Sequence, residues 1–117
     1  KQSKRRNLTS APVVFSVDPV MQFRREPLWE TLLEDADDGM CAQIVRLGAG
    51  MSVSGPDPRN AGGYYVFVGK GSLVRDGNEL PKWSMVVVEN TEAAFEIRAG
   101  DKGAEVLVLQ YPRGELD

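Results

Sequence analysis

Few side chains in this sequence could carry out catalysis. The chain contains no histidine and one cysteine, Cys41, so neither a Ser-His-Asp triad nor a Cys-His pair can form. The remaining candidates for proton transfer are Tyr64, Tyr65, Lys82 and Glu89. Their spacing in the sequence does not single out an acid/base pair. Cys41 lies in an apolar stretch, where a free cysteine is usually a small buried residue. The sequence therefore favours a protein that is not an enzyme.

The elements around these residues are organised by one glycine-bounded stretch, Gly48–Gly71. It contains a polar loop with two prolines at Ser52–Asn60 and a dense apolar strand at Tyr64–Val68. We expect Gly69–Gly71 to turn the chain, because glycine adopts positive φ readily, and Ser72–Arg75 to run back as the next strand.

Glycine spacing in this stretch resembles the first motif of the cupin family, G(X)5HXH(X)3–4E(X)6G. With Gly50 as the first glycine, the two histidines fall on Pro56 and Pro58, the glutamate on Gly62 and the closing glycine on Gly69. The spacing fits without a gap, although none of the metal-ligand residues is present.

The second cupin motif, G(X)5PXG(X)2H(X)3N, is matched in part. Its proline falls on Pro81 and its asparagine on Asn90, whereas its leading glycine, internal glycine and histidine fall on Arg75, Trp83 and Val86. The resemblance covers residues 40–111. It implies an all-β fold, a cupin-like double-stranded β-helix or jelly-roll barrel.

Metal-binding cupins hold a divalent ion with three imidazoles and a carboxylate. Here the four places are Pro56, Pro58, Gly62 and Val86, whose side chains offer no lone pair to a metal. We therefore expect a cupin barrel without a metal site and without a cofactor.

The resemblance also implies a ligand site at the barrel mouth, lined by the residues that surround the missing metal ligands. An aromatic wall with one guanidinium would suit a small organic anion. The alternative is a barrel filled by its own side chains, as small barrels usually are. The candidate ligand-binding residues are Gln43, Arg59, Asn60, Tyr65, Trp83 and Val86.

Charge is distributed unevenly along the chain. Four of the 14 basic residues lie within the first six positions, so the remainder carries ten basic and 17 acidic residues, a net charge of −7. A folded domain with this negative charge is poorly suited to bind nucleic acid. We expect residues 1–10 to be a flexible basic lead-in and residues 11–117 to form a single domain.

No signal-peptide pattern or membrane-spanning apolar run is present, which favours a cytoplasmic protein that does not bind membranes.

The rest of the chain shows short apolar runs separated by turn residues, a pattern typical of all-β domains. Residues 28–33 fit either a short helical turn or a strand on the outside of the barrel, since Trp29, Leu32 and Leu33 have helical spacing. The Asp76-Gly77 dipeptide predicts a hairpin. Further strands are predicted at 12–17, 40–47, 84–88, 93–98 and 104–111, with a turn at 100–103.

Two function classes follow. The first is a non-catalytic cupin-like domain that acts in small-ligand sensing or in homo-oligomeric assembly, with a homodimer as the expected state. The second is a metal-independent cupin-type enzyme of the isomerase or epimerase kind that acts on a small organic anion. The absence of histidine favours the first class.

Overall fold

The structure, a computed structural model, describes residues 13–35 and 40–111. Strands make up most of it, and the fold is all-β, as the sequence predicts. No helix among the described residues is long and apolar enough to cross a membrane. The elements in chain order are α1 (Asp18–Gln22), β1 (Leu28–Asp35), β2 (Met40–Leu47), β3 (Ser52–Ser54), the 3-10 helix η1 (Pro58–Asn60), β4 (Tyr64–Arg75), β5 (Asn78–Leu80), β6 (Met85–Val88) and β7 (Glu96–Gln110).

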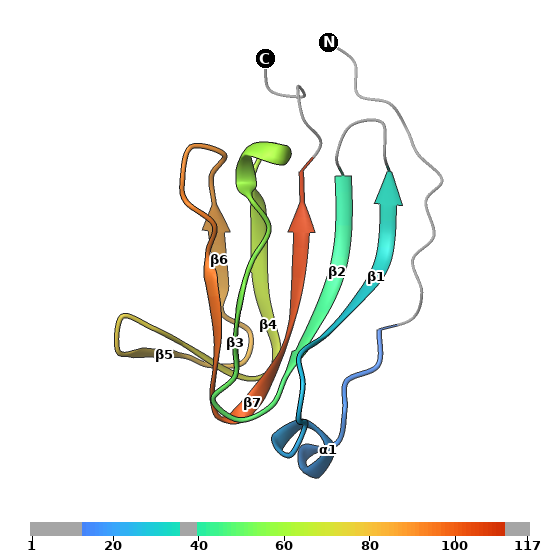
Figure 1. Cartoon of the computed structure of the whole chain (residues 1–117), viewed down its shortest axis with the longest axis vertical. Coiled ribbons are helices and arrows are strands. Elements are labelled where there is room, and N and C mark those ends of the chain that lie inside the picture. The colour runs from blue at the N-terminus through green and yellow to red at the C-terminus, as the bar shows by residue number, and fades with distance from the viewer. Residues whose placement is uncertain (1–12, 36–39, 112–117) are drawn as a thin grey trace.

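Long strand β7 lies at the centre of the antiparallel sheet (Figure 1). The strand order is β1-β2-β7-β4-β5, while β6 pairs with β4 and β3 pairs with β7. The C-terminal part of β7 lies between β2 and β4, and its first residues pair with β3. One strand thus takes part in three ladders, with β2, β4 and β3, and the all-β arrangement is compatible with a jelly-roll-like fold.

Two predicted turns are wrong, because both are bends within long strands. Residues 69–71 do not reverse the chain, since β4 runs through them from Tyr64 to Arg75. Likewise, the predicted strands 93–98 and 104–111 belong mainly to one strand, β7, which continues through residues 100–103.

Close approach of two backbones explains the glycine at position 71. Gly71 pairs with Ala104 and Leu73 with Ala99, so four residues of β7 lie opposite Ser72 alone. Gly71 has a φ of +76°, and a Cβ there would lie 2.2 Å from the carbonyl oxygen of Gly103. Only glycine satisfies both requirements, and the result is a bulge in a paired ladder instead of a turn.

The predicted strand at 12–17 is also wrong. Pro12 lies outside the described residues, and residues 13–17 have no regular structure and lead into α1. The backbone of Ser16 is bound by side chains instead of a strand partner: its N–H donates to Glu105 and its carbonyl accepts from Lys70.

Other predictions are confirmed. β2 has the predicted bounds, Met40–Leu47. Residues 28–33 form a strand, the second of the two alternatives, and β1 pairs with β2. Asp76 and Gly77 both have positive φ, 52° and 79°, in the hairpin that joins β4 to β5. In Figure 1, β5 projects sideways from the sheet.

The hydrophobic core covers one face of the sheet, here called the inner face. Rows of directly paired residues share this face, for example Val45–Val106–Val68 across β2, β7 and β4. All three are fully buried, as are Val66 and Val108 in the next row. β-branched side chains suit such a pleated, buried surface.

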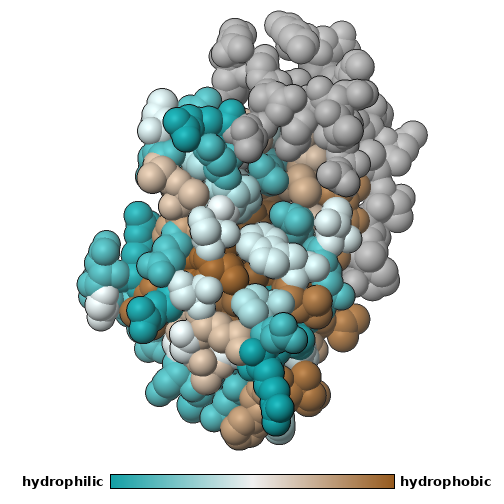
Figure 2. Space-filling model, viewed as in Figure 1, coloured by the Kyte–Doolittle hydropathy of each residue, from teal (hydrophilic) through white to brown (hydrophobic). Residues whose placement is uncertain are grey.

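The face of the molecule shown in Figure 2 is mostly hydrophilic, with hydrophobic residues visible near its centre.

Candidate functional site

Of the six predicted site residues, two lie on the inner face of the sheet. Gln43 pairs with Val108, which pairs with Val66, which in turn pairs with Val86. Gln43 and Val86 are therefore three strand spacings apart, about 14 Å. The space between them is occupied by the two buried valines, so they do not form a common site.

Two others lie on the opposite, outer face. Tyr65 directly precedes Val66, whose side chain faces inward. Because successive side chains of a strand point to opposite faces, Tyr65 faces outward. Trp83 lies outside the sheet with its ring centroid 5.7 Å from that of Phe67, and 65% of the residue is exposed. The register thus divides the predicted site between the two faces, with its two aromatic residues on the outer one and Gln43 and Val86 on the inner one.

Arg59 lies in η1 and is already paired. Its Nε and terminal nitrogen each lie 3.1 Å from a carboxylate oxygen of Asp57, and the backbone N–H of Arg59 also donates to Asp57. These hydrogen bonds from the Arg59 side chain and backbone hold the pKa of Asp57 below its usual value. The guanidinium predicted to bind an anion therefore has an acceptor of its own. The side chain of Asn60, the sixth residue, lies outside the described part of the structure.

The predicted barrel mouth is filled near Tyr64. This side chain is fully buried, and its hydroxyl accepts a hydrogen bond of 3.0 Å from the backbone N–H of Phe95. Burial raises the pKa of the Tyr64 hydroxyl. Pro58, at one of the cupin ligand positions, is also buried. At this position the residue that replaces a metal ligand thus contributes to packing.

The structure separates Tyr64 from two of the other predicted acid/base candidates. Tyr64 is buried in the core, Tyr65 lies on the outer face, and Lys82 lies over the exposed Trp83 ring at 4.8 Å. Among the described residues, no group of three or more cysteine, aspartate or glutamate side chains is arranged to hold a metal ion.

A contiguous patch of apolar residues lies on the outer face of β6, β4 and β7. Val87 pairs with Tyr65, which pairs with Leu109, and Met85 pairs with Phe67, which pairs with Leu107. At one end the ring of Tyr111 meets that of Tyr65 edge-on at 4.8 Å. We call this set the outer apolar patch: Tyr65, Phe67, Trp83, Met85, Val87, Leu107, Leu109 and Tyr111.

Much of this patch is open to solvent. Met85 is 55% exposed, Val87 is 50% exposed and Leu109 is 37% exposed. Isolated exposed apolar residues are normal, but a contiguous group on neighbouring strands indicates an interaction surface. None of its members carries a charge, although Lys82 lies over Trp83.

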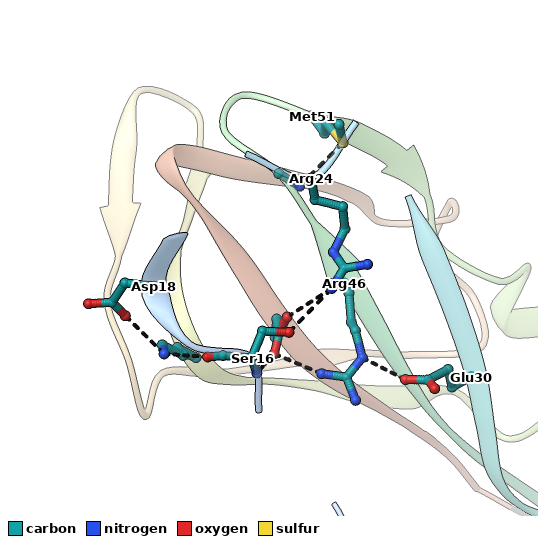
Figure 3. A network of polar contacts seen from close by, with 9 residues as sticks. Ser16, Asp18, Arg24, Glu30, Arg46 and Met51 are labelled. Carbon is teal, nitrogen blue, oxygen red and sulfur yellow. Dashed lines mark hydrogen bonds and ion pairs between the residues drawn. The ribbon is translucent and has the colours of Figure 1, made fainter. Parts of the chain in front are cut away.

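Further along the outer face, the apolar surface gives way to a charged row, Lys70–Glu105–Arg46. Glu105 is fully buried, and one of its oxygens lies 2.8 Å from both the Arg46 side chain and the Ser16 backbone nitrogen. Its other oxygen lies 3.7 Å from Arg24 and has no hydrogen-bond partner among residues 13–35 and 40–111. Figure 3 shows that the Arg24 and Arg46 side chains enter the same polar network from different parts of the chain.

Hydrogen bonds and ion pairs with the charged row attach residues 13–24 to the sheet. Ser16 Oγ accepts a hydrogen bond from Arg24, while Lys70 binds the Ser16 carbonyl and forms an ion pair of 2.9 Å with Asp18. Arg46 is also bound by Glu30 on β1, at 2.5 Å. Because a buried carboxylate is stable only when paired, this network holds the N-terminal segment in one position.

Sequence reasoning missed Glu105 as a key residue. The signal was a lone acidic residue in the apolar run from Ala104 to Leu109. A buried acidic side chain in a central strand requires a cationic partner. Arg46 on the neighbouring strand is that partner, but the pairing of β2 with β7 was not predictable from the sequence.

The sequence matches no protein-family model and no curated protein. Solved structures do share the fold. A chain from the Rhodobacter sphaeroides complex of SigE with the anti-sigma ChrR superposes with a TM-score of 0.55 at 12% identity, over 72% of this chain. The match covers 44% of that chain, so the protein corresponds to less than half of that neighbour's length.

Two further neighbours match over nearly their whole length. A protein of unknown function from Rhizobium leguminosarum has a TM-score of 0.53 and 14% identity, with 88% of this chain and 99% of that chain covered. The protein SPY1581 of unknown function from Streptococcus pyogenes has a TM-score of 0.55 and 15% identity, with 96% of this chain and 100% of that chain covered. Identities this low show a shared fold and nothing about activity.

Proposed function

We propose that this protein is a divergent, non-catalytic member of the cupin superfamily that acts in homo-oligomeric assembly, and that it forms a dimer through the outer apolar patch. The single observation that carries the proposal is the contiguity of uncharged, partly exposed side chains on β6, β4 and β7. The glycine spacing that resembles the first cupin motif and the jelly-roll fold support the superfamily assignment.

A second copy of the chain is the partner that the patch fits best. A two-fold interface brings the same surface of both copies together, so it must be self-complementary. The chain carries a net charge of −3, and two copies would repel each other through most acidic surfaces. An uncharged patch avoids this repulsion while it removes apolar area from water, which is worth about 25 cal/mol per Å². That one structural neighbour was solved as a complex of two proteins is in keeping with a role in assembly.

Sedimentation equilibrium at micromolar concentration tests the proposal. The wild-type protein should have the mass of a dimer. Val87→Asp places a charge within the patch and should weaken the dimer by at least about tenfold, equivalent to about 1.4 kcal/mol. Val20→Asp is the matched control, because Val20 is similarly exposed, at 53%, but lies on α1.

The outcomes are distinct. A wild-type protein that sediments as a monomer throughout the concentration range would overturn the proposal. A Val87→Asp variant that remains as dimeric as wild type would place the interface elsewhere. Circular dichroism of both variants confirms that neither substitution unfolds the sheet.

A further inference from the structure

A cleft away from the outer apolar patch is the strongest candidate for a ligand site. It lies between the β4–β5 turn, residues 92–96 and the bend of β7 at residues 98–101. Its volume is about 770 Å³, within the range of roughly 300–1,000 Å³ that is typical of small-molecule sites. Arg59, which the sequence predicted to bind an anion, does not line this cleft.

Two of the arginines that line the cleft have no acidic partner among the described residues. Within the described part of the chain, Arg75 and Arg98 form no ion pair, whereas Arg24, Arg46 and Arg59 each do. The Arg75 guanidinium lies 4.8 Å from the centre of the Phe95 ring, a cation–π contact that orients it. Arginine binds carboxylates well because its planar group presents parallel N–H donors. These two residues can therefore hold an anionic group.

Acidic residues also line the cleft, so a purely anionic ligand would be repelled. Glu92 accepts a hydrogen bond of 2.8 Å from the backbone N–H of Glu89, and Glu96 accepts one of 2.7 Å from Ser52. Each of these carboxylates retains further lone pairs. Asp76 and Asp101 add two more acceptors to the lining. The cleft thus offers donors and acceptors within one cavity.

We propose that this cleft binds a small hydroxy acid or amino acid. Arg75 and Arg98 bind its carboxylate, and the acidic side chains accept hydrogen bonds from its hydroxyl or ammonium group. This inference is independent of self-association, because the cleft and the outer apolar patch share no residue.

Titrations of the full chain with L-malate and with L-glutamate, monitored by amide chemical shifts, test the proposal. At least one of the two should shift the amides of Gly77 and Gly100 saturably, with a dissociation constant in the millimolar range or tighter, about 1 mM being worth 4 kcal/mol. Arg75→Gln combined with Arg98→Gln should weaken binding by about tenfold or more. Arg59→Gln is the matched control and should leave binding unchanged.

Succinate, which has carboxylates but no hydroxyl or ammonium group, separates the two halves of the proposal. It should bind more weakly than whichever probe binds. Equal affinity for succinate would overturn the assigned ligand class. Absence of a saturable shift with both L-malate and L-glutamate, or an equal loss in Arg59→Gln, would overturn the site itself.

Discussion

Two pairs of arginines differ in what surrounds them. Arg24 and Arg46 approach the fully buried Glu105 and help to hold the N-terminal segment against the sheet. Arg75 and Arg98 line an open cleft without an acidic partner among the described residues. A buried ion pair commits its members to the structure, because removing one partner leaves an uncompensated charge. An unpaired guanidinium at the surface remains free to bind a ligand.

Glycines in the same two regions show a parallel difference. Gly71 and Gly77 have nearly the same φ, +76° and +79°. A Cβ at Gly71 would collide with the backbone of Gly103, whereas a Cβ at Gly77 would meet nothing within 4 Å. Near the buried network the backbone is enclosed, and beside the cleft it is open. Local conformation alone therefore does not determine what a substitution costs.

The largest expected effect is that of Glu105→Ala. The substitution leaves the Arg46 guanidinium and the Ser16 N–H without their buried acceptor, so the free energy of unfolding should fall by about 3–5 kcal/mol. Urea denaturation measures this. Glu30→Ala removes the exposed partner of the same arginine and should cost at most about 1 kcal/mol. Equal losses in the two variants would show that burial does not distinguish these carboxylates.

Gly71→Ala and Gly77→Ala should differ by a smaller amount. Both variants force a non-glycine residue into the left-handed region, which costs about 1–2 kcal/mol. Gly71→Ala must also displace the Gly103 carbonyl, so its total cost should reach about 3 kcal/mol or more. Thermal unfolding of the two variants side by side provides the comparison. If Gly77→Ala proves the more destabilising, the enclosed bend and the open hairpin have been assigned the wrong way round.

The smallest effect concerns the edge of the buried network, where Lys70 meets exposed Asp18. The hydrogen bond and charge of Lys70 hold the pKa of Asp18 below its usual value of 3.8. Lys70→Gln should raise this pKa toward 3.8, as followed by carboxyl NMR shifts during a pH titration. Lys102→Gln is the control, because Lys102 makes a smaller contribution.

The sign of the accompanying pH dependence follows from the lowered pKa. The Asp18 carboxylate contributes stability above pH 3.8, and this contribution is lost as pH falls through the pKa in the folded protein. A Lys70→Gln variant whose stability falls with acidification as steeply as that of the wild type would contradict the assigned role of Lys70.

The sequence predicted the all-β class because local patterns determine strands. The bounds of β2 and the Asp76-Gly77 hairpin follow from alternation and turn chemistry within a few residues. The sequence did not show whether a glycine-rich segment turns the chain or bends a strand. The local sequence of Gly69–Gly71 is compatible with both a turn and a bent strand. Which of the two forms depends on pairing with β7, more than 30 residues later in the chain.

The candidate site shows the same division. Composition by itself excluded histidine-dependent catalysis, because no arrangement of the chain can supply an absent side chain. Tertiary structure decided which side each residue faces and which charges are paired. Tyr65 lies on the outer face of the sheet, Asp57 binds Arg59, and Arg75 lies over Phe95 with no acidic partner in the described part of the chain. These outcomes depend on register and on contacts between distant segments. Residue types and spacing determined the all-β class and the available chemistry, whereas packing determined where the long strands continue and which groups remain free to act.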